Sequence, residues 1–459
     1  MTRRNGSPLD PLVDSPRVRE AARALVEAVA EEAQQRSLTP KQYQRALRRL
    51  ERRRGRPLAL PILFAGPAGG ARVRLADGST KLDFAGGIGV YGFGHGDADL
   101  LETAATAAAC DTVFQGHLSP GPEYPRITDA LLRHAGKRLQ HVWLSISGAM
   151  ANENALKLIL QKQHPADRIV AFERNFAGRT LSLSEITDKP AYREGLPLRA
   201  GVHYVPFYDP DASDSIARSV AALDAHLQRH SGRIAAMCFE LVQGEGGFHT
   251  APPDFFRALM QRCHEAGIAV WVDEVQTFGR TGELFAFRTF GLEDLVDVVT
   301  AGKLLQGSAV LFSKAYNPKA GLVAGTYAGA TVGMAVGARI IERLEAEGYL
   351  GPEGRVSCLA GRFERRYEAL SKRARHAVGP RSGIGAMQAF VPFDGSRELA
   401  QEVLCAAFEE GLMLSLCGAQ PTKLRMLLPL NTTDEELEAA FSMLEKALFR
   451  VGGERDLPY

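Results

Sequence analysis

The sequence predicts an α/β fold, with a mainly parallel sheet in a large domain and a smaller α+β domain toward the C-terminus. Between about residues 97 and 340, short apolar runs rich in β-branched residues alternate with segments of helical pattern. Strands that are buried on both faces and joined by crossover helices have this pattern. After about residue 340, longer helices and a few strands replace the alternation. A length of 459 residues also favours more than one domain.

Residues 1–60 are expected to form a helical extension that begins with a loose tail over residues 1–14. One helix is predicted from Pro16 to Gln35, and a second begins after Thr39, a plausible N-cap. The second helix ends in an arginine-rich run over residues 48–56. We favour a solvated helix face for this run, with an acidic partner or a dimer surface as the alternatives.

Residues 61–96 are assigned to the N-terminal part of the small domain. Short strands are predicted at Ala71–Leu75 and Lys81–Phe84, on either side of a turn at residues 76–79. A glycine-rich stretch follows at residues 86–96. It allows the backbone to approach a ligand closely, or it is an ordinary irregular loop.

Residues 97–340 are predicted to form the large domain, and its parallel sheet is expected to have seven strands. The candidate strands are Val142–Ser147, Arg168–Phe172, Val202–Phe207, Ile234–Val242, Ile268–Val275, Val296–Thr300 and Ala309–Ser313. A long helix at Gly333–Glu347 leads into the C-terminal small domain, residues 341–459.

The composition excludes several classes of partner. Apolar residues make up 45% and charged residues 24%, and the net charge is +2, so we expect neither nucleic acid nor a membrane as partner. Six cysteines lie far apart without the Cys/His spacing of zinc sites, so we expect no metal centre. Scattered thiols, no apolar stretch of about 18 residues and no apolar signal core together predict a cytoplasmic protein.

Lys303 and Asp273 each follow an apolar run that reads as a buried strand. A lysine amine can form an imine with an aldehyde, and a carboxylate can keep a pyridine nitrogen protonated. This pair therefore indicates pyridoxal 5′-phosphate (PLP), whose ring acts as an electron sink. Taken alone, Lys303 would be a surface charge, and Asp273 would be a buried partner of Arg280.

Three other segments are suited to the same cofactor. Ser147 and Gly148 lie between a strand and a helix, where backbone N–H groups bind phosphate, although an ordinary capped turn has the same pattern. Phe176 suits stacking on an aromatic ring, and Arg179 suits a carboxylate, unless they are a core residue and a surface ion pair. Gln243–Gly247 either contributes polar groups at the sheet edge or is a solvated turn.

Taken together, these motifs resemble the class III aminotransferases, which are PLP enzymes of fold type I. The similarity runs from about residue 80 to 445 and is nearest to ornithine, acetylornithine and lysine ε-aminotransferases. The matching motifs are Ser147-Gly148-Ala149, Asn175-Phe176-Ala177-Gly178-Arg179-Thr180, Gln243-Gly244-Glu245-Gly246-Gly247, Asp273-Glu274-Val275-Gln276-Thr277, Gly279-Arg280-Thr281-Gly282 and Lys303.

The resemblance implies a role for each matching residue around the cofactor. Lys303 matches the Schiff-base lysine and proton carrier, and Asp273 matches the partner of the pyridine nitrogen. Val275 and Phe176 would pack on the two ring faces. Gln276 would hydrogen-bond the phenolic oxygen.

The phosphate and the substrates also have implied partners. Ser147, Gly148 and Ala149 correspond to the phosphate-binding turn. Thr326 resembles the hydroxyl residue that reaches the phosphate of a neighbouring subunit, which implies a homodimer with shared active sites.

Three residues match the family's substrate-binding positions. Arg425 resembles the arginine for the α-carboxylate of glutamate or 2-oxoglutarate. Glu245 matches the acid that masks this arginine while an ω-amine donor is bound. Arg179 matches the arginine for the acceptor's second carboxylate.

The chain departs from the family pattern at a few positions. Ala177 stands where a bulky His or Trp is usual, which implies a wider pocket, and Leu304–Ser308 replaces a glycine-rich stretch. The expected function is a PLP-dependent aminotransferase that moves a terminal ω-amine of an amino acid or diamine to 2-oxoglutarate by a ping-pong mechanism. The alternatives are another PLP reaction, such as that of an aminomutase, racemase or decarboxylase, and a non-catalytic partner-binding protein.

Overall fold

The computed structural model describes residues 12–111, 113, 117–198, 201–455 and 457. They divide into two compact units, one containing residues 111–354 and the other containing residues 11–110 and 355–459. The predicted domain boundaries at residues 60, 96 and 340 stay a prediction. Most of the predicted N-terminal tail lies outside the described residues, and Leu12–Asp14 forms a short 3₁₀ helix.

The first unit is built on a seven-stranded sheet, which confirms the predicted α/β fold. Its strand order is β4-β12-β11-β10-β7-β5-β6. Only β12 runs antiparallel to its neighbours, so the sheet is mainly parallel. The strands are β4 (Leu139–Ser145), β5 (Arg168–Phe172), β6 (Val202–Val205), β7 (Ile234–Phe239), β10 (Ala269–Glu274), β11 (Val298–Ala301) and β12 (Ser308–Ser313).

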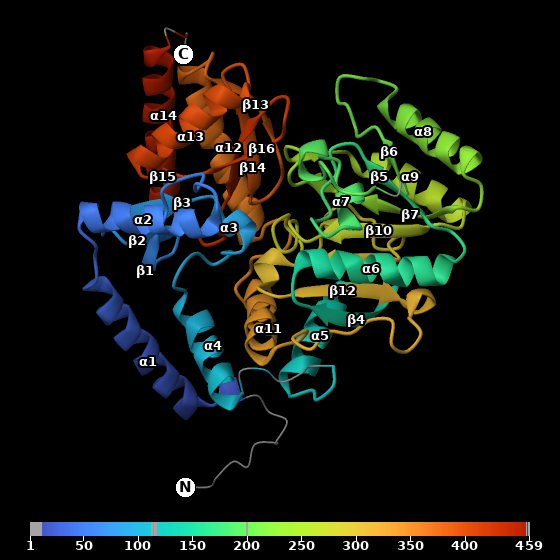
Figure 1. Cartoon of the computed structure of the whole chain (residues 1–459), viewed down its shortest axis with the longest axis horizontal. Helices are drawn as coiled ribbons and strands as arrows, with labels where there is room; N and C mark the ends of the chain where they lie inside the picture. Colours follow the sequence, from blue (N-terminus) through green and yellow to red (C-terminus); the bar gives the residue numbers. More distant parts are fainter. Residues whose placement is uncertain (1–11, 112, 114–116, 199–200, 456, 458–459) are drawn as a thin grey trace. The chain divides into compact units, whose positions relative to one another are not determined.

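Helices connect these strands and cover the sheet, and Figure 1 shows α6 lying along β4 and β12. The central strands β7, β10 and β12 are buried at every residue, which explains why their sequences are apolar without alternation. The main helices of this unit are α5 (Glu123–His134), α6 (Gly148–Gln163), α8 (Ser215–Arg229), α9 (Pro253–Glu265) and α11 (Thr331–Ala346). Shorter elements are α7 (Leu183–Ile186), α10 (Ala286–Thr289) and the β8 (Val242–Gln243) and β9 (His249–Thr250) hairpin.

The second unit contains two four-stranded sheets with helices. One sheet has the order β1-β2-β3-β15 and the other β13-β14-β17-β16. The strands are β1 (Phe64–Gly69), β2 (Arg72–Leu75), β3 (Thr80–Asp83), β13 (Val378–Ser382), β14 (Met387–Pro392), β15 (Leu412–Met413), β16 (Ser415–Cys417) and β17 (Lys423–Leu427). The helices are α1 (Pro16–Gln34), α2 (Pro40–Arg54), α3 (Gly86–Gly89), α4 (Ala98–Cys110), α12 (Arg355–Arg373), α13 (Arg397–Glu410) and α14 (Asp434–Glu454).

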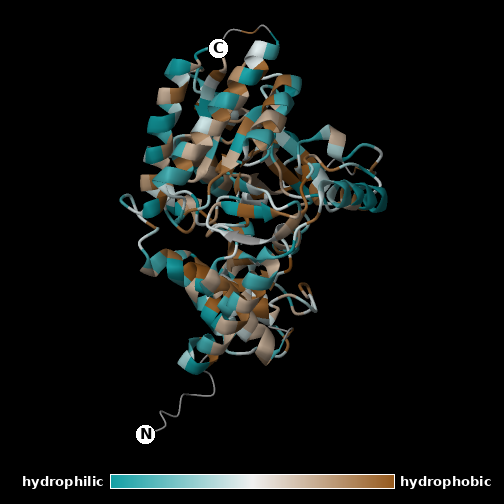
Figure 2. Ribbon diagram, turned by 90° about the vertical axis from the view of Figure 1, so that its left-hand side faces the viewer, coloured by the Kyte–Doolittle hydropathy of each residue, from teal (hydrophilic) through white to brown (hydrophobic). Residues whose placement is uncertain are grey.

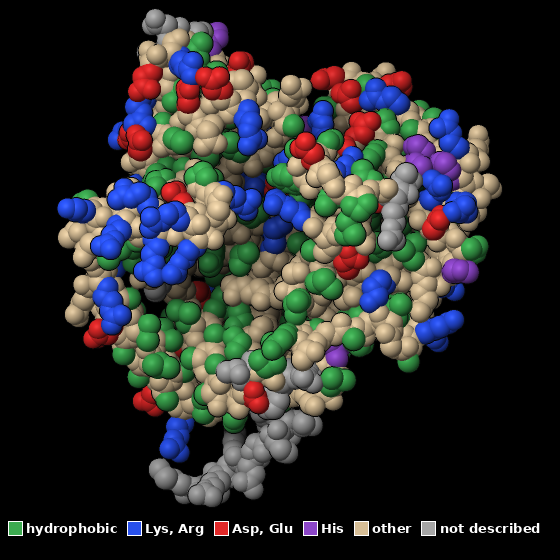
Figure 3. All heavy atoms as spheres, viewed as in Figure 1, with side chains coloured by type: hydrophobic (Ala, Val, Ile, Leu, Met, Phe, Trp, Pro, Cys, Tyr) green, Lys and Arg blue, Asp and Glu red, His purple; other side chains and the backbone are tan. Residues whose placement is uncertain are grey.

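The helices of the second unit bury one face each. Near the C-terminus, Figure 2 shows hydrophilic and hydrophobic residues interspersed along the helices, and α14 buries Leu437, Phe441, Leu444 and Leu448. Thr39 caps α2 as predicted, in a reciprocal capping box with Gln42. Lys and Arg side chains gather over α2 in Figure 3. Its last turn carries Arg52, Arg53 and Arg54.

Two further findings concern the cysteines and the helices. All six cysteines carry free thiols. Among the described residues, none of the helices combines the length and the apolar character needed to cross a bilayer.

Candidate active site

The candidate site lies at the carboxyl edge of the seven-stranded sheet. Asp273 pairs with Thr300 on the parallel strand β11, and Lys303 follows two residues after β11 ends. The turn between β4 and α6 starts from the same edge, because β4 and β11 flank β12 and share one direction. Ligands of open α/β sheets bind at this edge.

Asp273 is a buried carboxylate, with 7% of its surface exposed. It accepts hydrogen bonds from Asn152 Nδ2 (2.7 Å) and from the backbone N–H of Val275 (2.9 Å). Burial raises the pKa of Asp273 to about 6, while these hydrogen bonds and the charge of Lys303 act in the opposite direction. The site therefore favours a cationic hydrogen-bond donor next to this carboxylate. The hydrogen bonds go to Asn152 and Val275 rather than to Arg280, the partner considered in the sequence.

Asn152 is the residue of this site that the sequence analysis did not single out. Its Nδ2 atom also donates to the carbonyl oxygen of Ala177 (2.6 Å), and its Oδ1 accepts from Thr300 Oγ1 (2.6 Å). The side chain is 1% exposed. One amide on α6 thus ties together β10, β11 and the loop after β5. The available sequence feature was a pair of polar residues, Asn152 and Asn154, among the apolar residues of this helix face, and it does not identify the partners.

The turn before α6 has the form of an anion-binding helix N-terminus. Ser147 Oγ accepts from the backbone N–H of Met150 (3.2 Å), so its side chain caps the helix. A Cβ atom on Gly148 would lie 2.5 Å from Val275 Cγ1, and one on Gly302 would lie 3.2 Å from the same atom. Because Gly148 and Gly302 have no side chains, the turn before α6 and the turn before Lys303 can both pack closely against Val275.

Gln276 and Glu240 shape the opposite side of the site. A Cβ on Gly244 would lie 2.6 Å from Gln276 Nε2, and Gln276 Oε1 is buried without a hydrogen-bond partner among the described residues. Glu240 accepts from the backbone N–H groups of Phe176 (2.7 Å) and Gly244 (3.0 Å). Burial and then the charge of Asp273 raise the pKa of Glu240 to about 8. Glu240 therefore holds two loops in place, a role that the sequence analysis did not assign.

Lys303 is half-buried and has a positive φ of 45°. Its charge lowers the pKa values of both Asp273 and Glu240, which places its amine within electrostatic reach of the two carboxylates. A left-handed conformation in a residue other than glycine is uncommon and is concentrated at functional sites. The structure thus brings Lys303 and Asp273 together, as the sequence predicts.

These residues fit PLP. A buried carboxylate with a raised pKa suits a pyridinium N–H, and the buried amide oxygen of Gln276 has no hydrogen-bond partner among the described residues. The capped N-terminus of α6 suits a phosphate. Phe176 and Val275 are both half-buried. Lysine, carboxylate and phosphate site are the groups that this cofactor requires.

The predicted substrate-binding residues are placed as follows. Arg179 is exposed, and its guanidinium carbon lies 4.3 Å from the ring centre of Tyr192 and 5.9 Å from that of Phe176. Glu245 is half-buried and follows β8. Arg425, in the second unit, is 2% exposed and lies on β17, where its Nε donates to Ser415 Oγ (3.0 Å).

Thr326 is exposed, and no contact among the described residues links it to the residues around Asp273. Its neighbour Tyr327, 65% exposed, lines a cavity of about 210 Å³. The other lining residues come from the ends of β4, β12 and α11 and from α5: Ile127, Leu144, Ser145, Ile146, Gln306, Gly307, Ser308, Gly329, Ala330, Gly333 and Met334. The cavity therefore begins beside the turn that carries Ser147 and Gly148.

Known proteins match almost the whole chain. The family model "Aminotransferase class-III" matches residues 57–448. A 2-aminoadipate transaminase of Pseudomonas putida is 32% identical over 397 residues, which is 82% of this chain and 94% of that protein. An acetylornithine aminotransferase of Caldanaerobacter subterraneus is 29% identical, over 83% of this chain and 93% of that protein.

Solved structures share the fold. A lysine aminotransferase from M. tuberculosis superposes with a TM-score of 0.79 at 22% identity, covering 88% of this chain and 99% of that chain. A PLP-bound amine transaminase from an uncultivated Pseudomonas species superposes with a TM-score of 0.76 at 23% identity, covering 85% of this chain and 95% of that one.

Proposed function

The chain belongs to the class-III aminotransferase family and uses pyridoxal 5′-phosphate, and from this premise we propose that it moves a terminal amino group of an amino acid or diamine to 2-oxoglutarate. Relatives named for acetylornithine and lysine support a donor with a terminal amine, whereas 2-aminoadipate, for which another relative is named, carries its amino group next to a carboxylate. The observation that carries the proposed chemistry is the buried Asp273 at the sheet edge next to Lys303.

When bound, PLP supplies an electron sink for the electron pair left when the substrate carbon loses a proton. Lys303 Nζ would hold the aldehyde, and its free amine would accept and return the proton at the substrate carbon. Asp273 would stabilise a proton on the pyridine nitrogen, and Asn152 holds the Asp273 carboxylate in position. A general base of this kind contributes about 10²–10⁴-fold to the rate.

Other residues bind and orient. Backbone N–H groups of Gly148 and Ala149, at the turn capped by Ser147, hold the phosphate. Val275 and Phe176 confine the ring, and Gln276 hydrogen-bonds the phenolic oxygen. In the second half-reaction, Arg425 and Arg179 bind the two carboxylates of the 2-oxo acid. Glu245 masks Arg425 while the amine donor is bound. The two halves share one site, which gives ping-pong kinetics.

A donor panel tests the substrate class. Lysine, ornithine, acetylornithine, 4-aminobutyrate and diamines are each incubated with 2-oxoglutarate, and glutamate formation is measured. We expect turnover with at least one ω-amine and parallel lines in double-reciprocal plots. Turnover confined to α-amines would contradict the ω-amine assignment, and amine conversion without glutamate formation would indicate a different PLP reaction.

Hydride trapping tests Lys303. Borohydride reduction of the holoenzyme followed by peptide mass spectrometry should place the cofactor adduct on Lys303. Lys303→Ala should lose turnover by about 10²–10⁴-fold. As a matched control, Lys314→Ala changes an exposed lysine just after β12 and should keep both the adduct and the activity. An adduct on another side chain would refute the assignment.

We further propose a cytoplasmic homodimer in which Thr326 contacts the phosphate of the neighbouring subunit. Two exposed apolar side chains that line the cavity beside Ser147, Ile146 (63% exposed) and Tyr327 (65%), support a covering second copy. All six thiols are free, which fits a reducing compartment.

Subunit complementation tests the shared site. Thr326→Glu places a negative charge beside the phosphate and should inactivate the enzyme. Mixing Thr326→Glu chains with Lys303→Ala chains, followed by reassortment, should restore activity, because the mixed dimer has one site with both native residues. Mixing Lys303→Ala with the Lys303→Ala/Thr326→Glu double variant should restore none. Failure of the first mixture despite demonstrated exchange of subunits would refute a shared site.

A further inference from the structure

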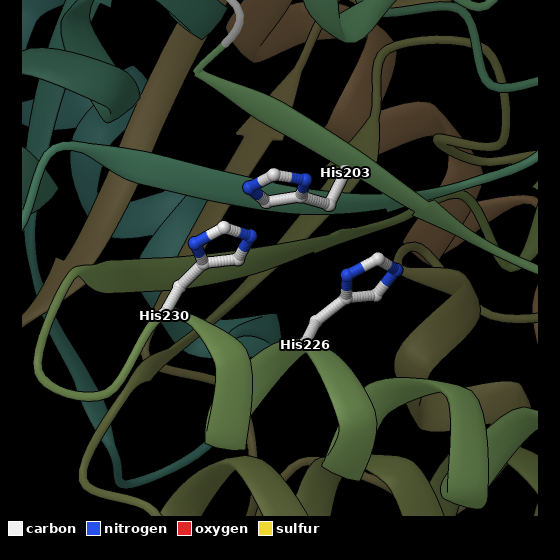
Figure 4. Close-up of side chains that lie close together, drawn as sticks. All are labelled: His203, His226 and His230. Atoms are coloured by element: carbon white, nitrogen blue, oxygen red, sulfur yellow. The ribbon is translucent and has the colours of Figure 1, made fainter.

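Three histidines converge beside an outermost strand of the seven-stranded sheet, away from the candidate active site. His203 is the second residue of β6, the edge strand of the sheet. His226 lies in the last turn of α8, and His230 follows the end of that helix. Figure 4 shows the three rings grouped between the strand and the helix end, and Figure 3 shows a group of His side chains at the surface close to α8.

The spacing of the three residues explains why they meet. His226 and His230 are four residues apart, so they project from one side of the helix end. The ring centres of His203 and His230 lie 4.2 Å apart and those of His203 and His226 lie 5.0 Å apart. One nitrogen from each ring can be chosen so that all three lie within 4.8 Å of one another. All three side chains are half-buried, so solvent reaches the group.

We propose that His203, His226 and His230 bind a divalent first-row transition-metal ion, with zinc as the reference ion, and that the ion ties α8 to the edge strand β6. Zinc–nitrogen bonds are about 2.0–2.1 Å long, so ligand nitrogens of a tetrahedral site lie about 3.3 Å apart. Reaching this spacing requires the rings to rotate, because the His203 ring is stacked on those of His230 and His226, with 13° and 23° between the ring planes. Three imidazoles leave one coordination position for water.

The hydrogen bond of His226 suits metal binding. His226 Nε2 lies 3.1 Å from the carbonyl oxygen of Tyr204. A carbonyl only accepts, so Nε2 carries the hydrogen and Nδ1 has the free lone pair. Metal-binding histidines commonly donate their second nitrogen to a backbone carbonyl in this way.

The charges around the cluster act in both directions. The C-terminus of α8 carries the negative end of the helix dipole, which favours a cation. Arg229 and Arg168 oppose one, and Arg168 Nη1 lies 3.3 Å from His203 Nε2. Asp167 offsets part of this charge through its ion pairs with Arg168 (3.9 Å) and Arg233. Arg168 thus competes with a metal ion for His203.

The sequence predicts no metal centre, because its Cys and His residues lack the short spacing of common zinc sites. His226 and His230 alone have the spacing of two ligands on a helix, and the third ligand comes from a strand 23 residues earlier. Only the packing of α8 against β6 brings the three together. Because three strands of the sheet separate β6 from β11, the strand before Lys303, the ion would stabilise the fold rather than take part in transamination.

Metal titration of the holoenzyme tests the proposal. Zinc binding is measured by equilibrium dialysis, and cobalt is used as a spectroscopic probe. We expect one ion per chain and a cobalt spectrum without a thiolate charge-transfer band, which excludes the exposed thiols of Cys110, Cys358 and Cys405. Zinc should also raise the melting temperature.

Variants separate the cluster from adventitious sites. His226→Gln and His230→Gln should each weaken binding at least about tenfold, while His376→Gln, at an exposed histidine elsewhere, should not. Arg168→Gln should strengthen binding, because it removes the competing guanidinium. Equal zinc binding by the wild type and His226→Gln, or no binding by the wild type, would overturn the proposal. Transaminase activity serves to show that the variants fold.

Discussion

At the scale of single residues, the site depends on a carboxylate that is kept away from water. Asp273 is only 7% exposed, and burial raises its pKa to about 6. A carboxylate in this state gains most from a cationic hydrogen-bond donor. Asn152 fixes the direction of the carboxylate and at the same time satisfies Thr300 and the Ala177 carbonyl. This amide therefore links the geometry of the candidate catalytic group to the stability of the fold.

Replacing Asn152 by alanine should lower both activity and stability. The change leaves the buried hydroxyl of Thr300 and the carbonyl of Ala177 without this partner, which costs about 1–3 kcal/mol of unfolding free energy. Activity should fall further than the loss of folded enzyme explains, because Asp273 is no longer oriented. The measurements are chemical denaturation and kcat on purified holoenzyme. Asn154→Ala is the control, since within the described part of the chain that buried amide makes one long hydrogen bond, to Ser145 Oγ at 3.5 Å. Equal effects of the two variants would contradict the orienting role.

Sequence alone could predict Lys303 and Asp273 as neighbours, but not Asn152 as their support. Each of the first two follows an apolar run, and the ends of parallel strands lie at one edge. The partners of Asn152 come from β10, β11 and the loop at Ala177, more than 20 residues away in every case. No local pattern encodes such a set. Glu240 falls within the predicted strand Ile234–Val242, and its hydrogen bonds to Phe176 and Gly244 depend on how two loops fold.

At the scale of secondary-structure elements, the turn from β4 into α6 is built around close approach. Gly148 is the first residue of α6, and its Cα faces Val275 so closely that a Cβ would lie 2.5 Å from Cγ1. Val275 follows β10, on which Asp273 lies. The turn that would bind the phosphate and Val275, which would cover the ring, can therefore lie this close together because residue 148 has no Cβ.

Gly148→Ala should weaken PLP binding while the chain still folds. The new methyl group must push Val275 or the turn aside, which moves the N–H groups of α6 away from the phosphate. We expect PLP affinity to fall about tenfold or more, in line with about 1.4 kcal/mol per tenfold change. Fluorescence titration of apoenzyme with PLP measures the affinity. Gly333→Ala, in the first turn of α11, is the control, because the nearest atom to its Cβ would be 3.8 Å away. Unchanged affinity in Gly148→Ala would contradict this account of the turn.

The elements themselves were largely predictable, but their directions were not. All seven strands of the main sheet lie where short apolar runs predict them, because burial on both faces leaves a clear pattern. The antiparallel direction of β12 has no counterpart in its composition; it follows from a short connection after β11 through Lys303–Leu305. Strand β1 was missed because Phe64–Gly69 contains two glycines and a proline, which local rules assign to a loop.

At the scale of the whole molecule, the buried carboxylates make stability depend on pH. Burial raises the pKa values of Asp273 to about 6, Glu274 to about 7 and Glu240 to about 8. In the unfolded chain each of these groups loses its proton near pH 4. Between these limits the folded apoprotein holds protons that the unfolded chain releases. Its unfolding free energy therefore falls as the pH rises through this window, by about 1.4 kcal/mol per pH unit for each such group.

Of the three buried carboxylates, only Asp273 is proposed to contact the pyridine nitrogen. PLP binding should therefore offset the loss of unfolding free energy at Asp273 alone. Above about pH 6 Asp273 is ionised and gains a cationic partner, whereas at about pH 5 it is protonated and gains little. The rise in melting temperature caused by a fixed excess of PLP should therefore increase with pH across this range. Differential scanning calorimetry with and without PLP measures it.

Covalent attachment to Lys303 also depends on pH, so the comparison is best made within Lys303→Ala chains, where only noncovalent binding remains. Adding Asp273→Asn in that background should flatten the pH dependence of the PLP-induced shift, since the amide has no charge to gain or lose. Titration of the cofactor phosphate contributes equally to both chains and cancels in the comparison. If the shift rises with pH to the same extent in both, the dependence comes from the phosphate, and Asp273 does not hold the pyridine proton.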